Sequence, residues 1–291
     1  MKMIQKICFV LLLGTFSSVY GGGCFKEHDV DDCRLKAEQG NSKAQRILGT
    51  MYASGQGVTQ DYKEAIQWWR KAAEQGDPKA QYNLGIVYEN GQGVVQDYKE
   101  AVKWYRKSAE QGIPQAQYNL GWMYANGKGV PLDYKAALKW YREPAEQGIS
   151  KAQNNLGRMY YLGQGVLQDY KEAVKWYRLG AEQGDAEAQN NLGLMYDEGQ
   201  GVPLDYKAAL KWYRKSAEQG YYGAQYNLGN SYYNGQGVHQ SKVMAHMYWS
   251  IAAVSGSKEV VDNRGLLEKM MTPSQIEKAQ DLAREWMRTH Q

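Results

Sequence analysis

The chain has 291 residues and a formal net charge of +4, with 24 Tyr and 9 Trp but 3 Phe, and 32 Gly but 6 Pro. Its 23% of charged residues exclude an integral membrane bundle, and its 43% of apolar residues exclude a disordered chain. The excess of Tyr over Phe indicates a few aromatic sites that are copied many times along the chain.

Residues 1–21 have the pattern of a secretory signal peptide. Lys2 and Lys6 flank the start, an apolar run covers 7–13, and small residues lead to a predicted cleavage near Gly21. A buried N-terminal helix is the alternative; a membrane span is not expected, because a helix needs about 20 apolar residues to cross a bilayer. Cleavage removes two lysines and no acidic residue, which lowers the formal charge from +4 to +2. The remaining charges alternate in sign, so we expect a periplasmic or secreted protein that does not bind nucleic acid.

The exported chain retains two cysteines, Cys24 and Cys33, which we predict to form a disulfide. In one straight helix their Cα atoms would lie about 13.5 Å apart, whereas a disulfide requires about 7 Å or less. Residues 24–28 should therefore fold back onto a helix that begins within 29–32. Two alternatives stay open. One is lipidation of Cys24, and the other is zinc bound by Cys24, His28 and Cys33, although that spacing lacks a CxxC pair and a fourth ligand.

From residue 44 the sequence repeats with a period of 36 residues. The period defines six units, at 44–79, 80–115, 116–151, 152–187, 188–223 and 224–259. The cysteine segment and a half unit precede them at 22–43. Capping helices are expected over 260–291, where Thr272 and Pro273 have the pattern of a helix start. Because a single helix pair cannot bury its apolar faces, we expect an all-α solenoid of stacked pairs.

Each unit has the apolar spacing of two helices. In the first unit, the first helix is predicted over 44–53 and ends at Gly55, where the missing Cβ favours a left-handed C-cap. Asp61 is the predicted N-cap of a second helix over 62–74, whose apolar residues recur at helical spacing. Pro144 departs from this pattern in the third unit, and a kink or an early helix end is expected there.

The repeated pattern Ala-Gln-x-x-Leu-Gly-x-x-Tyr-x-x-Gly-x-Gly-Val, followed by Asp-Tyr-x-x-Ala-x-x-Trp-Tyr-x-x-Ala-Glu-Gln-Gly, resembles the Sel-one-like repeat, a relative of the tetratricopeptide repeat. Residues 272–276 also resemble the terminal helix of bacterial members. The resemblance implies a right-handed superhelix of helical hairpins that acts as an adaptor between proteins, without chemistry of its own. It further implies that the first helices line a concave groove. We expect a monomer that binds a protein or an extended peptide in this groove.

The six copies of the first helix differ most on one arc about 100° wide, at the positions of residues 46, 50, 53 and 54 in the first unit. Packing keeps copies alike, whereas a face that contacts one extended ligand is free to differ; a neutral solvent face is the alternative. The predicted partner-binding residues of the concave face are Tyr82, Tyr118, Trp122, Asn154, Arg158, Tyr161, Asn190, Tyr226, Asn230 and Tyr233. Among them, Tyr82, Tyr118 and Trp122 lie on neighbouring first helices and are expected to form an exposed cluster.

One asparagine next to this arc is constant in five copies, at Asn83, Asn119, Asn155, Asn191 and Asn227. These side chains either present amides to a ligand or tie adjacent helices together. Repetition without change favours the structural role.

A hydrolase is the alternative function, because some secreted relatives of this repeat family carry a β-lactamase or penicillin-binding assignment. That chemistry needs a Ser-x-x-Lys pair with a Lys-Thr-Gly or Ser-Asp-Asn partner. Ser255 and Lys258 form the single Ser-x-x-Lys of the sequence, and neither partner motif occurs. The four histidines have no metal-ligand spacing. We therefore expect no catalytic residue, no metal and no cofactor.

Overall fold

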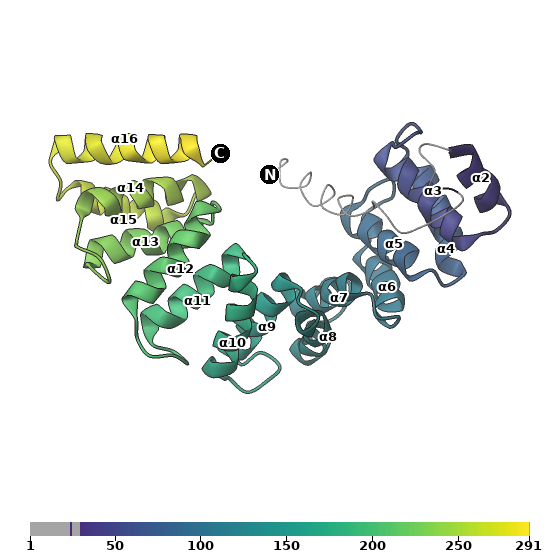
Figure 1. The fold of residues 1–291 in the computed structure, drawn as a ribbon, viewed down its shortest axis with the longest axis horizontal. Helices are drawn as coiled ribbons and strands as arrows, with labels where there is room; N and C mark the ends of the chain where they lie inside the picture. The colour runs from purple at the N-terminus through teal and green to yellow at the C-terminus, as the bar shows by residue number, and fades with distance from the viewer. Residues whose placement is uncertain (1–23, 25–29, 291) are drawn as a thin grey trace. The chain divides into compact units, whose positions relative to one another are not determined.

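The computed structural model describes Cys24 and residues 30–290, and within these ranges every regular element is a helix (Figure 1). This all-α architecture confirms the fold class that the period indicates. None of the helices in the described ranges is long and apolar enough to span a membrane. The predicted signal segment, residues 1–21, lies outside the described residues.

The helices fall into two compact units, divided between Ser108 and Ala109. The first unit contains α2 (Val30–Glu38), α3 (Ser42–Ser54), α4 (Tyr62–Glu74), α5 (Pro78–Asn90) and most of α6 (Tyr98–Ala109). The second unit contains α7 (Pro114–Asn126), α8 (Tyr134–Glu146), α9 (Ser150–Leu162), α10 (Tyr170–Glu182), α11 (Ala186–Glu198), α12 (Tyr206–Glu218), α13 (Tyr222–Asn234), α14 (Lys242–Ala252), the 3₁₀ turn η2 (Ala253–Ser255), α15 (Lys258–Glu268) and α16 (Pro273–Thr289).

Helix ends lie where the sequence places them. Gly55 follows α3 with a φ of 73°, and its N–H donates to the carbonyl of Met51. The Asp61 carboxylate caps α4 by accepting from the N–H groups of Lys63 and Glu64. Ala65, Ile66, Trp69 and Ala73, which recur at helical spacing in the second helix, are buried and form the face of α4 that packs on α3 and α5.

The two helices of a pair approach closely because a glycine faces an aromatic ring. In α9 the position of a Cβ on Gly157 would lie 2.7 Å from Cδ1 of Tyr177 in α10. A side chain there would collide with the ring, so the repeated Gly and the repeated Tyr or Trp form one packing unit. This contact accounts for much of the excess of Tyr and Trp in the composition.

Successive pairs are joined by a glutamine that is constant in the repeat. Nε2 of Gln153 in α9 donates to the carbonyl of Ala145 in the preceding α8 at 3.0 Å. Oε1 of Gln153 accepts from Nε2 of Gln183, after α10, at 2.6 Å. The buried amide of Gln153 therefore bonds to the pair before it and to its own pair, and such bonds each contribute about 0.5–1.5 kcal/mol.

The expected early end at Pro144 is wrong. Helix α8 ends at Glu146, the same place in the repeat as Glu182 of α10 and Glu218 of α12. Pro144 lies in the last turn and is buried, and the N–H of Gln147 bonds to the carbonyl of Glu143 beyond it. The last turn keeps its neighbouring backbone bonds and its packing, which offsets the N–H that proline lacks.

The N-terminal disulfide is present. Cys24 and Cys33 are bonded, with their Cα atoms 4.5 Å apart, and α2 begins at Val30, inside the predicted range. Both sulfur atoms are used by this bond. The capping helix also begins as predicted, because Thr272 caps α16 and Pro273 is its first residue.

Candidate partner-binding site

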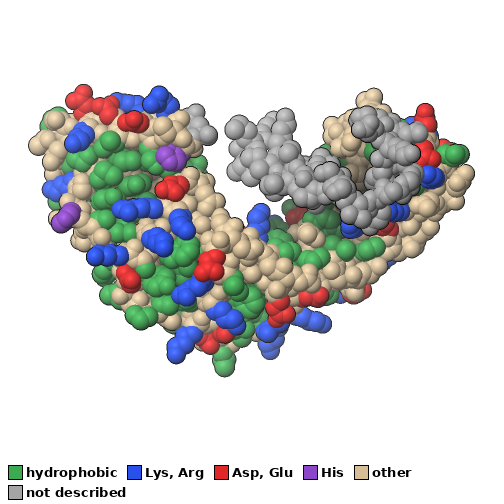
Figure 2. Space-filling view, viewed as in Figure 1, with side chains coloured by type: hydrophobic (Ala, Val, Ile, Leu, Met, Phe, Trp, Pro, Cys, Tyr) green, Lys and Arg blue, Asp and Glu red, His purple; other side chains and the backbone are tan. Residues whose placement is uncertain are grey.

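The predicted partner-binding residues lie on the first helices of five repeats. Tyr82 lies on α5; Tyr118 and Trp122 on α7; Asn154, Arg158 and Tyr161 on α9; Asn190 on α11; and Tyr226, Asn230 and Tyr233 on α13. On the face shown in Figure 2, Lys and Arg side chains are interspersed with Asp and Glu and do not form a basic stripe.

Asn154 and Asn190 do not face an open groove, and this part of the prediction is corrected. Their side chains are 2% and 8% exposed. Oδ1 of Asn154 accepts from Nδ2 of Asn191 at 2.9 Å, and Oδ1 of Asn190 accepts from Nδ2 of Asn227 at 2.9 Å. These bonds join the first helices of successive repeats. The structural role favoured for the constant asparagines is therefore confirmed at Asn191 and Asn227.

Tyr118 and Trp122 are half-buried, so the expected exposed aromatic cluster is also corrected. The Tyr118 ring lies 5.7 Å from the ring of Tyr141 in α8, and Trp122 packs in the same cluster of apolar side chains. In the first compact unit, which ends at Ser108, Tyr82 is half-buried in the same way, with its ring 5.9 Å from that of Tyr105. Each of these aromatics is therefore part of the packing of the solenoid, and Tyr118 also contacts a cluster that contains Ala152 and Leu156 of the next repeat.

Tyr226, Asn230 and Tyr233 gather around one tryptophan. Oδ1 of Asn230 accepts from Nε1 of Trp249 at 3.1 Å, and the Tyr233 ring lies 5.5 Å from that of Trp249. The Tyr226 hydroxyl donates to Glu259 at 2.7 Å. This group forms part of the packing between α13, α14 and α15, in which the Tyr226 hydroxyl and Oδ1 of Asn230 already have partners.

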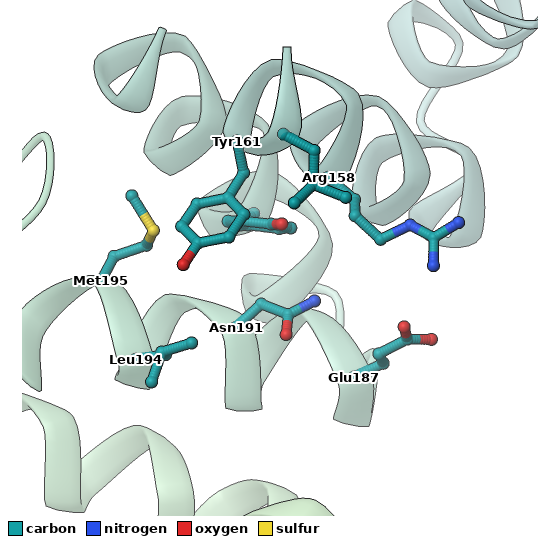
Figure 3. Close-up of a pocket in the computed structure, with 8 residues that line it drawn as sticks. Arg158, Tyr161, Glu187, Asn191, Leu194 and Met195 are labelled. Atoms are coloured by element: carbon teal, nitrogen blue, oxygen red, sulfur yellow. The ribbon is translucent and has the colours of Figure 1, made fainter. Parts of the chain in front are cut away.

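Arg158 and Tyr161 line a cleft between α9 and α11, with a volume of about 240 Å³ (Figure 3). Leu162 and Tyr177 line it beside them, and α11 contributes Glu187, Asn191, Leu194 and Met195. Figure 3 shows Arg158 and Glu187 toward one end of the cleft, and Leu194 and Met195 toward the other. The cleft thus has an apolar part and a charged end.

The charged end has two charged side chains that can bind a partner. Arg158 and Glu187 are exposed, and among the described residues neither forms a hydrogen bond or an ion pair. Burial raises the pKa of the Tyr177 hydroxyl, and burial likewise raises the pKa of Tyr161, with Glu198 and Tyr170 adding to the effect. Both hydroxyls are therefore neutral at physiological pH. The cleft offers one cation, one anion and neutral donors around an apolar floor.

The sequence prediction missed the α11 side of this cleft. Glu187 lies one turn before the arc that was compared, at a place where three sibling repeats carry Lys43, Lys79 and Lys151. A comparison of the six copies at that position shows that this repeat has a negative side chain where three others have a positive one. Leu194 was on the variable arc, in the same place as Arg158 one repeat earlier, although it was not chosen as a site residue.

The residues of the hydrolase alternative form no recognisable constellation. Oγ of Ser255 accepts from the backbone N–H of Ser257 at 3.3 Å, within its own turn. His246 is buried and bonds to Glu268 at 2.8 Å. Within residues 24 and 30–290, no three His, Cys, Asp or Glu side chains are grouped to hold a metal ion.

Comparisons with known proteins agree with the repeat architecture. The profile of the Sel1 repeat matches residues 42–77, 78–113, 114–149, 150–185, 186–221 and 223–257. No curated protein matches the chain.

Two solved structures are similar along most of the chain. One is c5321, described as a protective antigen present in uropathogenic Escherichia coli strains displaying an SLR fold, with 40% identity and a TM-score of 0.76. The match covers 90% of this chain and 56% of that one, so the chain spans little more than half of the length of c5321. The other is a Sel1 repeat protein from Oxalobacter formigenes, with 42% identity, a TM-score of 0.67, and coverage of 74% of this chain and 86% of that one.

Proposed function

Because the chain belongs to the Sel1 repeat family, whose members are generally protein–protein interaction scaffolds, we propose that it is a non-enzymatic scaffold that binds an extended segment of a partner protein along its first helices. One observation carries this proposal: the cleft at Arg158 and Glu187 combines an apolar floor with two unpaired, opposite charges.

The size of the cleft favours a side chain of a polypeptide over a free small molecule. Small-molecule pockets usually have volumes of about 300–1,000 Å³, and this cleft has about 240 Å³. That volume suits one large apolar side chain inserted beside Leu194. A flanking acidic group of the partner would meet Arg158, and a flanking basic group would meet Glu187.

The predicted location is part of the proposal. Residues 1–21 have the pattern of an export signal, and the Cys24–Cys33 disulfide is typical of an oxidising compartment. We propose a monomer in the periplasm or outside the cell. Sequencing the N-terminus of the protein recovered from the periplasm or medium tests this, and an intact Met1 would contradict it.

A peptide library tests the binding surface. Peptides of twelve residues displayed on phage are selected against the chain, and the enriched ones are titrated against wild type, Arg158→Glu and Lys135→Glu. We expect enriched peptides with a large apolar residue beside an acidic one, at least tenfold weaker binding to Arg158→Glu, and unchanged binding to Lys135→Glu, whose exposed side chain lies on α8. Equal binding to wild type and Arg158→Glu would remove the cleft from the proposal.

A further inference from the structure

Helix α15 occupies the place of a first helix in a seventh repeat. Asn263 lies 36 residues after Asn227, and its Nδ2 donates to the hydroxyl of Tyr226 at 2.9 Å. Asn227 makes the corresponding bond to Asn190, one repeat earlier. Leu267 is 1% exposed and lies 36 residues after the buried Ser231. The hydrogen-bond ladder of the first helices therefore continues into α15, and so does part of their buried face, although Arg264 stands at the place of the buried Leu228.

In each of the six repeats, the glycine of the first helix is covered by an aromatic ring of the second helix. A Cβ on Gly49 would lie 2.6 Å from Trp69, one on Gly121 would lie 2.9 Å from Tyr141, and the other four glycines face their rings equally closely. The pairs are Gly49 with Trp69, Gly85 with Tyr105, Gly121 with Tyr141, Gly157 with Tyr177, Gly193 with Tyr213, and Gly229 with Trp249.

The glycine of α15 has no such cover. Gly265 lies 36 residues after Gly229, and a Cβ on it would meet nothing within 4 Å. Helix α16 follows in the sequence, but its Ala283 and Trp286 pack on Met247 and Ile251 of α14. Figure 1 shows α16 lying along α14. The face of α15 around Gly265 is thus a first-helix face without its second helix.

The same helix exposes large apolar side chains. Val261, Leu266 and Met270, on and just after α15, are 40%, 58% and 54% exposed. Val261 stands 36 residues after Gln225, which is 1% exposed, so the exposure of Val261 departs from the burial of this place in the complete repeats. Leu266 and Met270 stand at the places of Asn230 and Asn234, on the arc that varies between copies, and they add apolar surface beside Gly265.

We propose that α15 binds an amphipathic helix of a partner protein, which packs an aromatic residue against Gly265. The six second helices define the chemistry of this occupant, because each fills the equivalent gap with a Trp or Tyr four residues after a small Ala, as in Ala65 and Trp69. This surface is separate from the cleft at Arg158, and the inference does not depend on it.

A second copy of the chain is a poorer occupant. The second helices α4, α8, α10, α12 and α14 are each packed against the first helix of their own repeat. Helix α2 occupies the place of a second helix, but Cys33 stands 36 residues before Trp69, at the aromatic position, and is held in the disulfide. It offers no ring to Gly265.

The test uses a hydrocarbon-stapled, fluorescein-labelled peptide with the sequence of residues 62–74, titrated by anisotropy against the full chain. The protein variant is Gly265→Ala. Its methyl group has free space in the unbound chain, but it stands where the ring of a bound helix would lie. We expect Gly265→Ala to keep the Tm of the wild type or raise it, and to weaken peptide binding at least tenfold. A peptide with Trp69→Ala should lose binding to the same extent.

Three results would overturn the proposal. They are absence of peptide binding to wild type, equal binding by wild type and Gly265→Ala, and equal binding of the two peptides. Sedimentation of the wild type alone provides a further check: self-association that Gly265→Ala abolishes would assign this face to a second copy and contradict the choice of a partner helix.

Discussion

Nδ2 of Asn191 in α11 donates to Oδ1 of Asn154 in α9 at 2.9 Å, and this bond joins two successive repeats. The same bond recurs one repeat later between Asn227 and Asn190. Because Asn154 is 2% exposed, its oxygen depends on this protein donor in the folded chain. Removing the donor leaves a buried oxygen without a hydrogen bond, and this costs more free energy than the bond itself contributes to stability.

Asn191→Ala should lower the free energy of unfolding by about 1–3 kcal/mol, since it leaves the Oδ1 of Asn154 buried without a donor. Urea unfolding monitored by circular dichroism measures this loss. The matched control is Asn126→Ala, whose exposed side chain bonds only to a carbonyl of its own helix. The control should change stability by less than about 0.5 kcal/mol, and an equally small effect of Asn191→Ala would contradict the ladder.

Gly193→Ala should destabilise the chain, because its methyl group would lie 2.7 Å from the Tyr213 ring. Overpacking of this kind costs about 1–3 kcal/mol. The same substitution at Gly265 should be neutral or stabilising by up to about 1 kcal/mol, since alanine favours helix and the space is free. Thermal unfolding of the two variants side by side measures the difference. A lower Tm for Gly265→Ala than for Gly193→Ala would show that the seventh glycine is covered after all.

Reduction of the Cys24–Cys33 disulfide should loosen α2 and leave the stability of the second compact unit, which begins at Ala109, unchanged. The bond closes a loop with a sequence separation of 9, for which loop entropy predicts a local stabilisation of about 2–3 kcal/mol. Stacked repeats contact mainly their neighbours, so the effect should stay local. Hydrogen exchange with and without reductant measures it. Loss of protection should be confined to residues near 30–38, and equal loss in α10 and α12 would be inconsistent with this view.

Asp197→Asn should make the chain more stable at neutral pH and leave it unchanged near pH 3. Burial raises the pKa of Asp197, and the charge of Glu198 raises it further. The folded state therefore holds this proton more tightly than the unfolded state does, and stability falls as the pH rises above the ordinary value of 3.8 through the raised pKa. Asn carries no charge at any of these pH values, so the variant does not lose this stability as the pH rises. Tm values of both proteins from pH 3 to pH 7 test it, and parallel curves would disprove the assignment.

The sequence predicted the fold closely because its signals are local and repeated. Gly55 recurs in all six repeats, and Asp61 recurs in five, with Ser241 at its place in the sixth. Each helix boundary was therefore indicated several times. Pro144 was misjudged because its effect depends on where in the last turn it falls and on the packing around it.

The candidate site was harder to predict, because a helical wheel describes one helix at a time. The wheel placed Asn154 and Asn190 on the variable arc, which was expected to face a partner. In the structure the first helix of the next repeat covers both side chains. Trp122 was on the variable arc, but it is half-buried in a cluster that includes Tyr141 of its own pair and Met159 of the next repeat. Arg158 and Tyr161 were predicted from the variable arc, and both line the cleft because the neighbouring repeat does not cover them fully. Their counterpart Glu187 lies on another helix, and only the stacking of α9 on α11 brings it near.

Site-specific photocrosslinking tests the proposed scaffold most directly. A photoreactive amino acid is placed at Leu194, in the cleft, and separately at Leu179, an exposed residue of the second helix α10. We predict that irradiation in the native host crosslinks a discrete partner protein through position 194, that Arg158→Glu reduces this product, and that position 179 gives none. Crosslinks from position 179 with none from position 194 would contradict binding along the first helices.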